Sequence, residues 1–257
     1  MDTKIVRYIL CRMLGVEAAL LLVPVLVAVI YQEKCGIVFL IPIVILCLLF
    51  WVVGRKRPEH GQIYGKEGMV IVALAWILWS LFGAMPFTLS GYIPSYVDAF
   101  FETVSGFTTT GSSIIPDVEV LPHCLLFWRS FTHWIGGMGV LVFLLCLLPM
   151  SGGGYSMNLM KAESPGPSVS KLVPKVRSTA KLLYGLYVAL SLLELALLLL
   201  GSMPLFDALC TTFGTAGTGG FGIKNSSIGE YSAYIQSIVT IFMILFGINF
   251  NAYFLIL

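Results

Sequence analysis

Two stretches of the chain combine threonine and glycine in a pattern that could bind an ion through the backbone. Residues 98–112 (DAFFETVSGFTTTGS) align without a gap on residues 207–221 (DALCTTFGTAGTGGF), so the second stretch is an internal copy of the first. Five of the 15 aligned positions are identical, including Asp98 and Asp207. Glycine permits backbone angles that aim successive carbonyl oxygens in one direction, and a row of carbonyls can replace the hydration shell of a potassium ion. The pattern therefore predicts backbone ligands for a dehydrated cation.

The similarity between the two copies extends beyond the aligned stretches. Residues 83–86 (GAMP) precede the first copy and residues 201–204 (GSMP) precede the second, and glycine recurs in each following apolar stretch, at 136–137 and at 247. Each copy predicts a spanning helix, a short half-helix, an extended Thr/Gly segment and a second spanning helix. Threonine and glycine runs can also be helix-packing faces. Two unrelated packing faces have no reason to share these flanking residues, which favours the repeat.

The predicted half-helices run from about Val97 to Gly106 and from about Phe206 to Gly214. Each would direct the negative, C-terminal end of its dipole toward the Thr/Gly segment that follows. Backbone that is neither helix nor closed barrel is tolerated at membrane depth only where it is buried in protein or lines a water-filled path. We therefore expect the two segments to line such a path.

The composition places these elements in a membrane. Hydrophobic residues make up 58% of the chain, charged residues make up 11%, and the mean hydropathy is +0.94. These values exclude a soluble globular domain. Apolar stretches of the length that crosses a hydrocarbon core predict an all-α polytopic membrane protein, with two leading transmembrane helices followed by two helix/pore-loop/helix repeats. The predicted spans are Met13–Ile30, Ile37–Val53, Met69–Leu89, Leu121–Leu148, Leu182–Leu200 and Ile235–Leu257.

The distribution of Lys and Arg orients the chain, because these residues accumulate in cytoplasmic loops. They gather in the N-terminus, in residues 54–68 and after Met150, so we expect these segments on the cytoplasmic side. Residues 90–120 and 201–234 then face outward, and the first of them contains four acidic residues and no Lys or Arg. An acidic outer vestibule favours cations.

These features divide the chain into a leading two-helix region (1–66), a first repeat (67–152), a cytoplasmic loop (153–181) and a second repeat (182–257). Residues 151–178, rich in Gly, Pro and Ser and then basic, predict either a solvated linker or a docking surface for a cytoplasmic partner. The six cysteines lie within or beside apolar stretches without metal-ligand spacing, so we expect free thiols. The net charge of +2 gives no indication of nucleic-acid binding.

Arg129, His133 and Glu194 are among the polar residues that fall inside the predicted spans. Arg129 needs a partner or an exit to water. It either pairs with Glu102 or Asp98, bracing the half-helix, or snorkels to the membrane interface. We expect His133 to form a hydrogen bond between helices, and Glu194 is an intramembrane carboxylate whose role the sequence leaves open.

Four longer stretches resemble those of a known family. They are ETVSGFTTTGSS (102–113), WRSFTHWIGGMGV (128–140), MNLMKAESPGPSVSKLVPKVRSTAKLLYG (157–185) and GTGGFG (217–222). Through them nearly the whole chain resembles the TrkH type within the TrkH/KtrB/HKT superfamily of cation transporters, whose members string four helix–pore–helix repeats on one chain. The first two helices match the extra leading pair of the TrkH type.

The resemblance implies potassium uptake across the plasma (inner) membrane, with a cytoplasmic N-terminus. It implies no enzymatic activity and no covalently bound cofactor, with the potassium ion as the transported ligand. The implied partners are potassium, membrane lipid, a cytoplasmic TrkA-like nucleotide-binding regulatory subunit and, in the complete form, a second copy in a homodimer, but no nucleic acid. The implied filter ligands are Thr109, Thr110 and Gly111 in the first repeat and Thr218, Gly219 and Gly220 in the second.

The chain carries two of the family's four repeats and stops at Leu257 within an apolar run. We therefore expect the N-terminal half of a longer protein, which would not conduct alone. Two other function classes remain open: a non-conducting accessory membrane subunit, or an intramembrane enzyme using Asp98, Glu102 and His133. No HExxH, GxSxG or P-loop signature is present, and enzyme chemistry has no need for a duplicated Thr/Gly segment.

Overall fold

The computed structural model describes residues 3–54, 65–139, 176–250 and 253 of the 257-residue chain. These residues form helices and connecting loops with no β-strand among them, which confirms the all-α prediction. The elements in chain order are α1 Thr3–Leu20, α2 Leu22–Ile30, η1 Lys34–Phe39, α3 Leu40–Val53, α4 Gly65–Leu89, α5 Tyr96–Phe107, η2 Val118–Val120, α6 His123–Gly137, α9 Val176–Leu200, α10 Leu205–Ala216 and α11 Ala233–Gly247.

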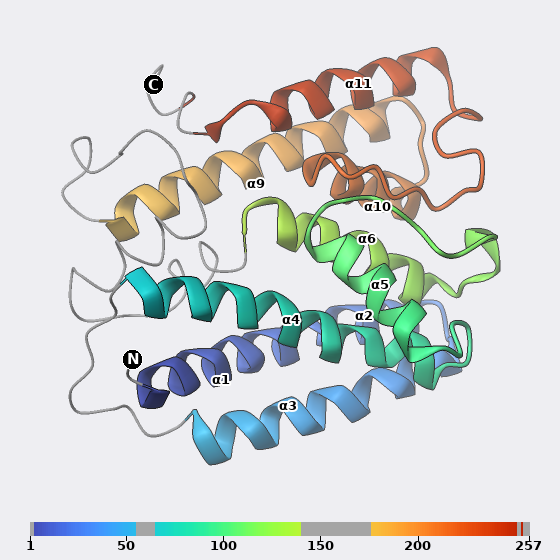
Figure 1. The fold of residues 1–257 in the computed structure, drawn as a ribbon. Coiled ribbons are helices and arrows are strands. Elements are labelled where there is room, and N and C mark those ends of the chain that lie inside the picture. The colour runs from blue at the N-terminus through green and yellow to red at the C-terminus, as the bar shows by residue number, and fades with distance from the viewer. Residues whose placement is uncertain (1–2, 55–64, 140–175, 251–252, 254–257) are drawn as a thin grey trace.

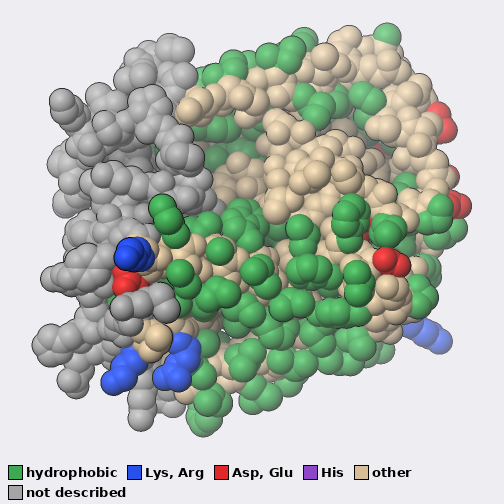
Figure 2. All heavy atoms as spheres, viewed as in Figure 1, with side chains coloured by type: hydrophobic (Ala, Val, Ile, Leu, Met, Phe, Trp, Pro, Cys, Tyr) green, Lys and Arg blue, Asp and Glu red, His purple; other side chains and the backbone are tan. Residues whose placement is uncertain are grey.

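Long apolar helices account for the membrane character of the chain. Four helical stretches have the length and composition to cross a membrane, and α11 is a shorter apolar helix. Large hydrophobic side chains are exposed along them, and Figure 2 shows such side chains covering the face over α3 and α4. An apolar surface of this extent requires lipid around it. The chain is therefore a multi-pass membrane protein. The four stretches are Thr3–Ile30, Lys34–Val53, Lys66–Leu89 and Lys181–Leu200.

The first span differs from its prediction in two ways. It starts at Thr3, before the predicted Met13. Basic residues such as Arg7 lie on an exposed face of α1, so they are part of the helix and do not mark its end. It is also interrupted at Leu21, between α1 and α2. Pro24 lacks the backbone N–H that would donate to the carbonyl of Leu20, which explains the interruption.

The remaining helices form two units of the same order, α4–α5–α6 and α9–α10–α11 (Figure 1). The short helices α5 and α10 are each 12 residues long and lie where the half-helices are predicted. Their first residues, Tyr96 and Leu205, are equivalent positions of the internal repeat. α6 packs against both α5 and α10. It is therefore one of the elements through which the two units meet.

Helix α6 is the centre of the packing, and most of its residues are buried. Its Trp128 donates from Nε1 to the carbonyl of Gly83 in α4 at 2.9 Å. The same indole makes edge-to-face contacts with Phe107 of α5 and Phe39 of η1. These contacts hold α6 against α4, α5 and η1.

Several predicted segments fall outside the described residues. The loop predicted to be cytoplasmic is described only from residue 176, and residues 55–64 of the first basic loop are not described. The span predicted to end at Leu148 is described to residue 139, and the span predicted to end at Leu257 is described to residue 250 and at residue 253.

Candidate functional site

The two Thr/Gly segments start at the C-terminal ends of α5 and α10 and turn in the same way. Thr109 and Thr218 have φ of 53° and 55°, and Gly111 and Gly220 have φ of 76° and 79°. Positive φ is uncommon for a residue with a side chain. The amide of Thr109 donates to the carbonyl three residues earlier at 3.0 Å, and the amide of Thr218 does so at 2.8 Å. The repeated sequence is therefore matched by a repeated backbone turn.

The two segments touch through their glycines. A Cβ added to Gly111 would overlap the backbone carbonyl of Gly219, so the backbones are in direct contact there. Gly220 differs, because the nearest atom to its added Cβ is Cε of Met243 at 3.9 Å. The structure thus brings together the two triplets predicted as ligands, Thr109, Thr110 and Gly111 with Thr218, Gly219 and Gly220.

Two glycines of α6 allow this approach. A Cβ on Gly136 would overlap the carbonyl of Phe107, at the end of α5. A Cβ on Gly137 would lie 3.0 Å from Cα of Gly217, which caps α10. Larger residues would push the two short helices apart. The carbonyl ends of α5 and α10 carry partial negative charge, so their convergence beside α6 favours a cation.

A buried ion pair joins α5, which leads into the first segment, to α6. Nε of Arg129 donates to Oε1 of Glu102 at 2.6 Å, and the side chains are 3% and 0% exposed. Pairing of Arg129 with Glu102 is therefore confirmed, whereas pairing with Asp98 and snorkelling to the interface are wrong. The amide of Asp98 lies 3.4 Å from its acceptor, the hydroxyl of Ser95, in the first turn of α5.

Arg129 also reaches the second repeat, a contact that sequence reasoning missed. Its guanidinium donates to the carbonyl of Gly222 at 2.8 Å and lies 3.6 Å from the ring centroid of Phe221. Arg129 and Gly222 are 93 positions apart in the sequence, and the group that accepts from Arg129 is a backbone carbonyl. Residue types could therefore not have identified this contact.

The prediction for His133 is corrected. Neither ring nitrogen makes a hydrogen bond within the described part of the chain. The imidazole instead stacks on Phe221, with ring centroids 4.0 Å apart and an interplanar angle of 14°. A Cβ on Gly219 would overlap this ring. His133 therefore packs against the second segment through the face of its ring.

Outside the segments, one asparagine joins the loops of the two repeats. Oδ1 of Asn225 accepts from the amide of Val118 at 3.0 Å, and its Nδ2 donates to Oδ1 of Asp117 at 2.7 Å. Its own amide donates to Oε1 of Glu119 at 3.0 Å. The acidic residues predicted to line an outer vestibule thus help to connect the two loops.

Glu33, in the loop after α2, caps the N-terminus of α6. Its carboxylate accepts from the amides of His123 and Cys124 at 2.8 and 3.0 Å, and Oε1 lies 2.9 Å from Nδ1 of His123. Burial by itself would raise the pKa of Glu33, but the hydrogen bonds from Cys124 and His123 outweigh it, so the pKa is lowered. The leading two-helix region is thereby tied to the central helix.

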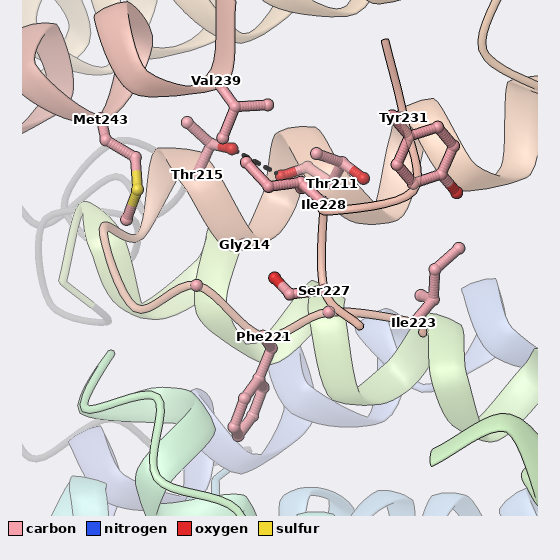
Figure 3. Close-up of a pocket in the computed structure, with 12 residues that line it drawn as sticks. Thr211, Gly214, Thr215, Phe221, Ile223, Ser227, Ile228, Tyr231, Val239 and Met243 are labelled. Carbon is pink, nitrogen blue, oxygen red and sulfur yellow. Dashed lines mark hydrogen bonds between the residues drawn. The ribbon is translucent and has the colours of Figure 1, made fainter. Parts of the chain in front are cut away.

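A cavity of about 80 Å³ lies on the other side of the second segment (Figure 3). α10 contributes Thr211 and Thr215 to its wall, and α11 contributes Val239 and Met243. Figure 3 shows the ring of Phe221 pointing away from these side chains, toward α6. The cavity therefore separates the second segment from α11.

Three remaining observations bear on chemistry. Glu194 is completely buried in α9, and its carboxyl oxygens have no hydrogen-bond partner in the described ranges. The described residues contain no cluster of three or more His, Cys, Asp or Glu side chains that could hold a metal ion. The five described cysteines are free, as predicted.

Comparison with known proteins gives consistent matches. A model of the TrkH family, described as cation transport protein, matches residues 36–257. The Trk system potassium uptake protein TrkH of Escherichia coli (strain K12) is 37% identical over 244 residues, which cover 92% of this chain and 50% of that protein. The protein of the same name from Salmonella typhimurium (strain LT2) is also 37% identical over 244 residues, with the same coverage.

The fold matches a solved structure as well. The crystal structure of the potassium transporter TrkH from Vibrio parahaemolyticus superimposes with a TM-score of 0.82 at 29% identity. The match covers 99% of this chain and 52% of that one. The chain thus spans about half the length of the relatives that it matches.

Proposed function

Because the chain belongs to the TrkH family of cation transport proteins, we propose that it forms part of a potassium uptake pathway and that its two Thr/Gly segments contribute to the ion filter. The observation that carries this proposal is the contact between Gly111 and Gly219. It joins two segments that share one backbone turn and that each follow the carbonyl end of a short helix.

The proposed ligands are backbone carbonyls of the two triplets. Carbonyl oxygens can replace the water molecules around potassium. Left-handed backbone at alternate residues allows successive carbonyl oxygens to point in the same direction. The left-handed residues are Thr109 and Gly111 in one segment and Thr218 and Gly220 in the other. In this proposal the ion passes without covalent chemistry. The relatives named above are transport proteins, which gives no support to the enzyme or accessory-subunit alternatives.

The proposal includes the setting of the pathway. The chain lies in the plasma (inner) membrane with its N-terminus in the cytoplasm, as the exposed Lys4 and Arg7 at the start of α1 favour. Lipid surrounds the apolar helices. In the complete form two copies associate. A TrkA-like nucleotide-binding subunit docks on the basic loops of the cytoplasmic face.

Ion competition in glycine variants tests the filter assignment. Gly111→Ser and Gly220→Ser are introduced into the whole gene product, and potassium uptake is measured against increasing sodium in cells that lack their own potassium uptake. A side chain at either position strains left-handed backbone, so the preference for potassium over sodium should fall in both variants. Gly185→Ser is the matched control, since nothing lies within 4 Å of its added Cβ. Unchanged ion competition in both filter variants would show that the assignment is wrong.

A further inference from the structure

One buried arginine connects the two Thr/Gly segments. We infer that Arg129 is a positioning residue that holds both segments in the arrangement needed for ion selection, and that the second segment depends on it because the second repeat has no equivalent ion pair. The inference rests on the proposed function, since it concerns the same two segments. It assigns to Arg129 a part in selectivity beyond the stability of its own helix.

On the side of the first repeat, Arg129 acts through Glu102. Oε1 of Glu102 also accepts from the hydroxyl of Ser113 at 2.9 Å, and Oε2 accepts from the amide of Ile114 at 2.9 Å. The carboxylate thus fastens the chain just beyond Gly111 to α5. A buried carboxylate requires a compensating charge, and the guanidinium provides it at 2.6 Å.

On the side of the second repeat, Arg129 makes contact directly. Its hydrogen bond to the carbonyl of Gly222 and its position over the ring of Phe221 hold the two residues that follow Gly220. A cation over an aromatic face at 3.6 Å from the centroid is a favourable contact. A planar guanidinium can donate in two directions and stack at the same time, whereas a lysine ammonium cannot stack as a plane.

The internal repeat shows what the second copy lacks. The ungapped alignment of the two copies places Thr211 at the position of Glu102. Helices α6 and α11 are each 15 residues long, and aligning them from their first residues places Val239 at the position of Arg129. Gly222 likewise stands where the first copy has Ser113, when the ungapped alignment is continued. The second repeat therefore has neither the acid nor the base of the ion pair.

The cavity occupies the space that these shorter side chains leave open. Thr211, Gly222 and Val239 all line it (Figure 3). The amide of Ile223, which corresponds to that of Ile114, makes no hydrogen bond to another described residue. The second segment therefore borders this cavity on its α11 side, and on its α6 side it contacts Arg129 and the ring of His133. Loss of Arg129 should therefore disturb both segments.

Variants that separate folding from selectivity test the inference. Arg129→Gln alone would leave a buried, unpaired carboxylate, so the informative variant is Glu102→Gln/Arg129→Gln, which removes both charges together. Arg129→Lys keeps the charge beside Glu102, and Arg7→Gln is the matched control because Arg7 is exposed at the cytoplasmic end of α1. The whole gene product is purified, checked for monodispersity and reconstituted. The ratio of potassium to sodium permeability is then measured.

The expected result is a selective defect in correctly assembled protein. In the double variant the ratio of potassium to sodium permeability should fall roughly tenfold, the order expected for losing a hydrogen bond to a charged group. Arg129→Lys should fall between the double variant and the parent, and Arg7→Gln should match the parent. A parental ratio in either the double variant or Arg129→Lys overturns the inference and leaves the proposed function intact. A parent protein without preference for potassium overturns the proposed function instead.

Discussion

The backbone of Gly111 lies against the carbonyl of Gly219, so closely that a Cβ at Gly111 would overlap it. Gly111 also has a φ of 76°. Gly220, its counterpart in the sequence repeat, has nearly the same φ, 79°, but an added Cβ there would meet only Cε of Met243, at an ordinary contact distance of 3.9 Å. Two reasons for glycine thus apply at Gly111, and one applies at Gly220.

This difference predicts graded effects of alanine at the two positions. Gly220→Ala should cost about 1 to 2 kcal/mol, the strain of left-handed backbone for a residue with a side chain. Gly111→Ala should cost more, because the new methyl group must also displace the carbonyl of Gly219. Thermal unfolding of both variants in detergent measures the order. Equal midpoints for the two variants would contradict the close approach at Gly111.

A second prediction concerns the glycines of α6. Gly136→Ala should destabilise the protein by about 1 to 3 kcal/mol, as overpacking does, because its methyl group meets the carbonyl of Phe107. Gly185→Ala is the matched control in another helix, where nothing lies within 4 Å of the new methyl group. The midpoint should fall for Gly136→Ala and stay near the parent for Gly185→Ala. Similar midpoints for the two variants would mean that α6 does not lie as close to α5 as described.

The cap on α6 predicts a pH dependence. The pKa of Glu33 is lower in the folded protein than its ordinary value of 4.5. Its contribution to stability is therefore fully present above the unfolded value and disappears as the pH falls through the folded one. Glu33→Gln should lower the midpoint at pH 7, since losing a capping group costs about 1 kcal/mol. The gap between parent and variant should shrink as the pH falls below 4.5. A constant gap would show that the carboxylate charge makes no contribution.

The sequence predicts those parts of the site that depend on neighbouring residues, such as the ends of the short helices. The half-helices were located because the aligned stretches share spacing and because a helix ends where threonine and glycine begin. Arg129 was assigned two possible acidic partners, and the choice needed the structure. Asp98 lies at the start of α5 and Glu102 one turn later, and only packing decides which of them faces α6.

Other features depend on contacts between distant parts of the chain. Glu33 caps α6 across 90 positions, and Asn225 joins the loops of the two repeats across more than 100. The sequence predicts a hydrogen bond for His133 because a buried imidazole usually has one, but the ring that it stacks on, Phe221, belongs to the other repeat. Such pairings arise from the three-dimensional placement of the repeats and leave no local pattern in the sequence.

The proposed orientation predicts which side of the membrane each end of α4 faces. Tyr92, just beyond its C-terminal end, is 47% exposed, and Lys66, near its first residue, is also exposed. In a background without cysteine, Tyr92→Cys should react with an impermeant thiol reagent added to whole cells. Lys66→Cys should react only after the cytoplasmic side is opened to the reagent. Labelling of the two positions from the same side would contradict a membrane-spanning α4.

The last prediction transfers the ion pair of the first repeat to the second. Thr211 lines the cavity and corresponds to Glu102 of the first copy. Thr211→Glu therefore places a carboxylate in the cavity without a guanidinium to pair with it. Thr211 is partly buried, so an uncompensated charge there should destabilise the protein by about 1 to 3 kcal/mol. Thr211→Gln has nearly the same shape without the charge and should cost clearly less, which makes it the matched control.

Adding Val239→Arg should recover part of that loss, because Thr211 and Val239 line the same cavity at the positions that correspond to Glu102 and Arg129. The four proteins of a double-mutant cycle, the parent, both single variants and the double variant, are compared by thermal midpoint in detergent. A double variant more stable than Thr211→Glu gives a favourable coupling and supports the correspondence between α6 and α11. If the two losses simply add, the side chains at 211 and 239 do not meet. The cavity would then not be the counterpart of the space that Glu102 and Arg129 fill.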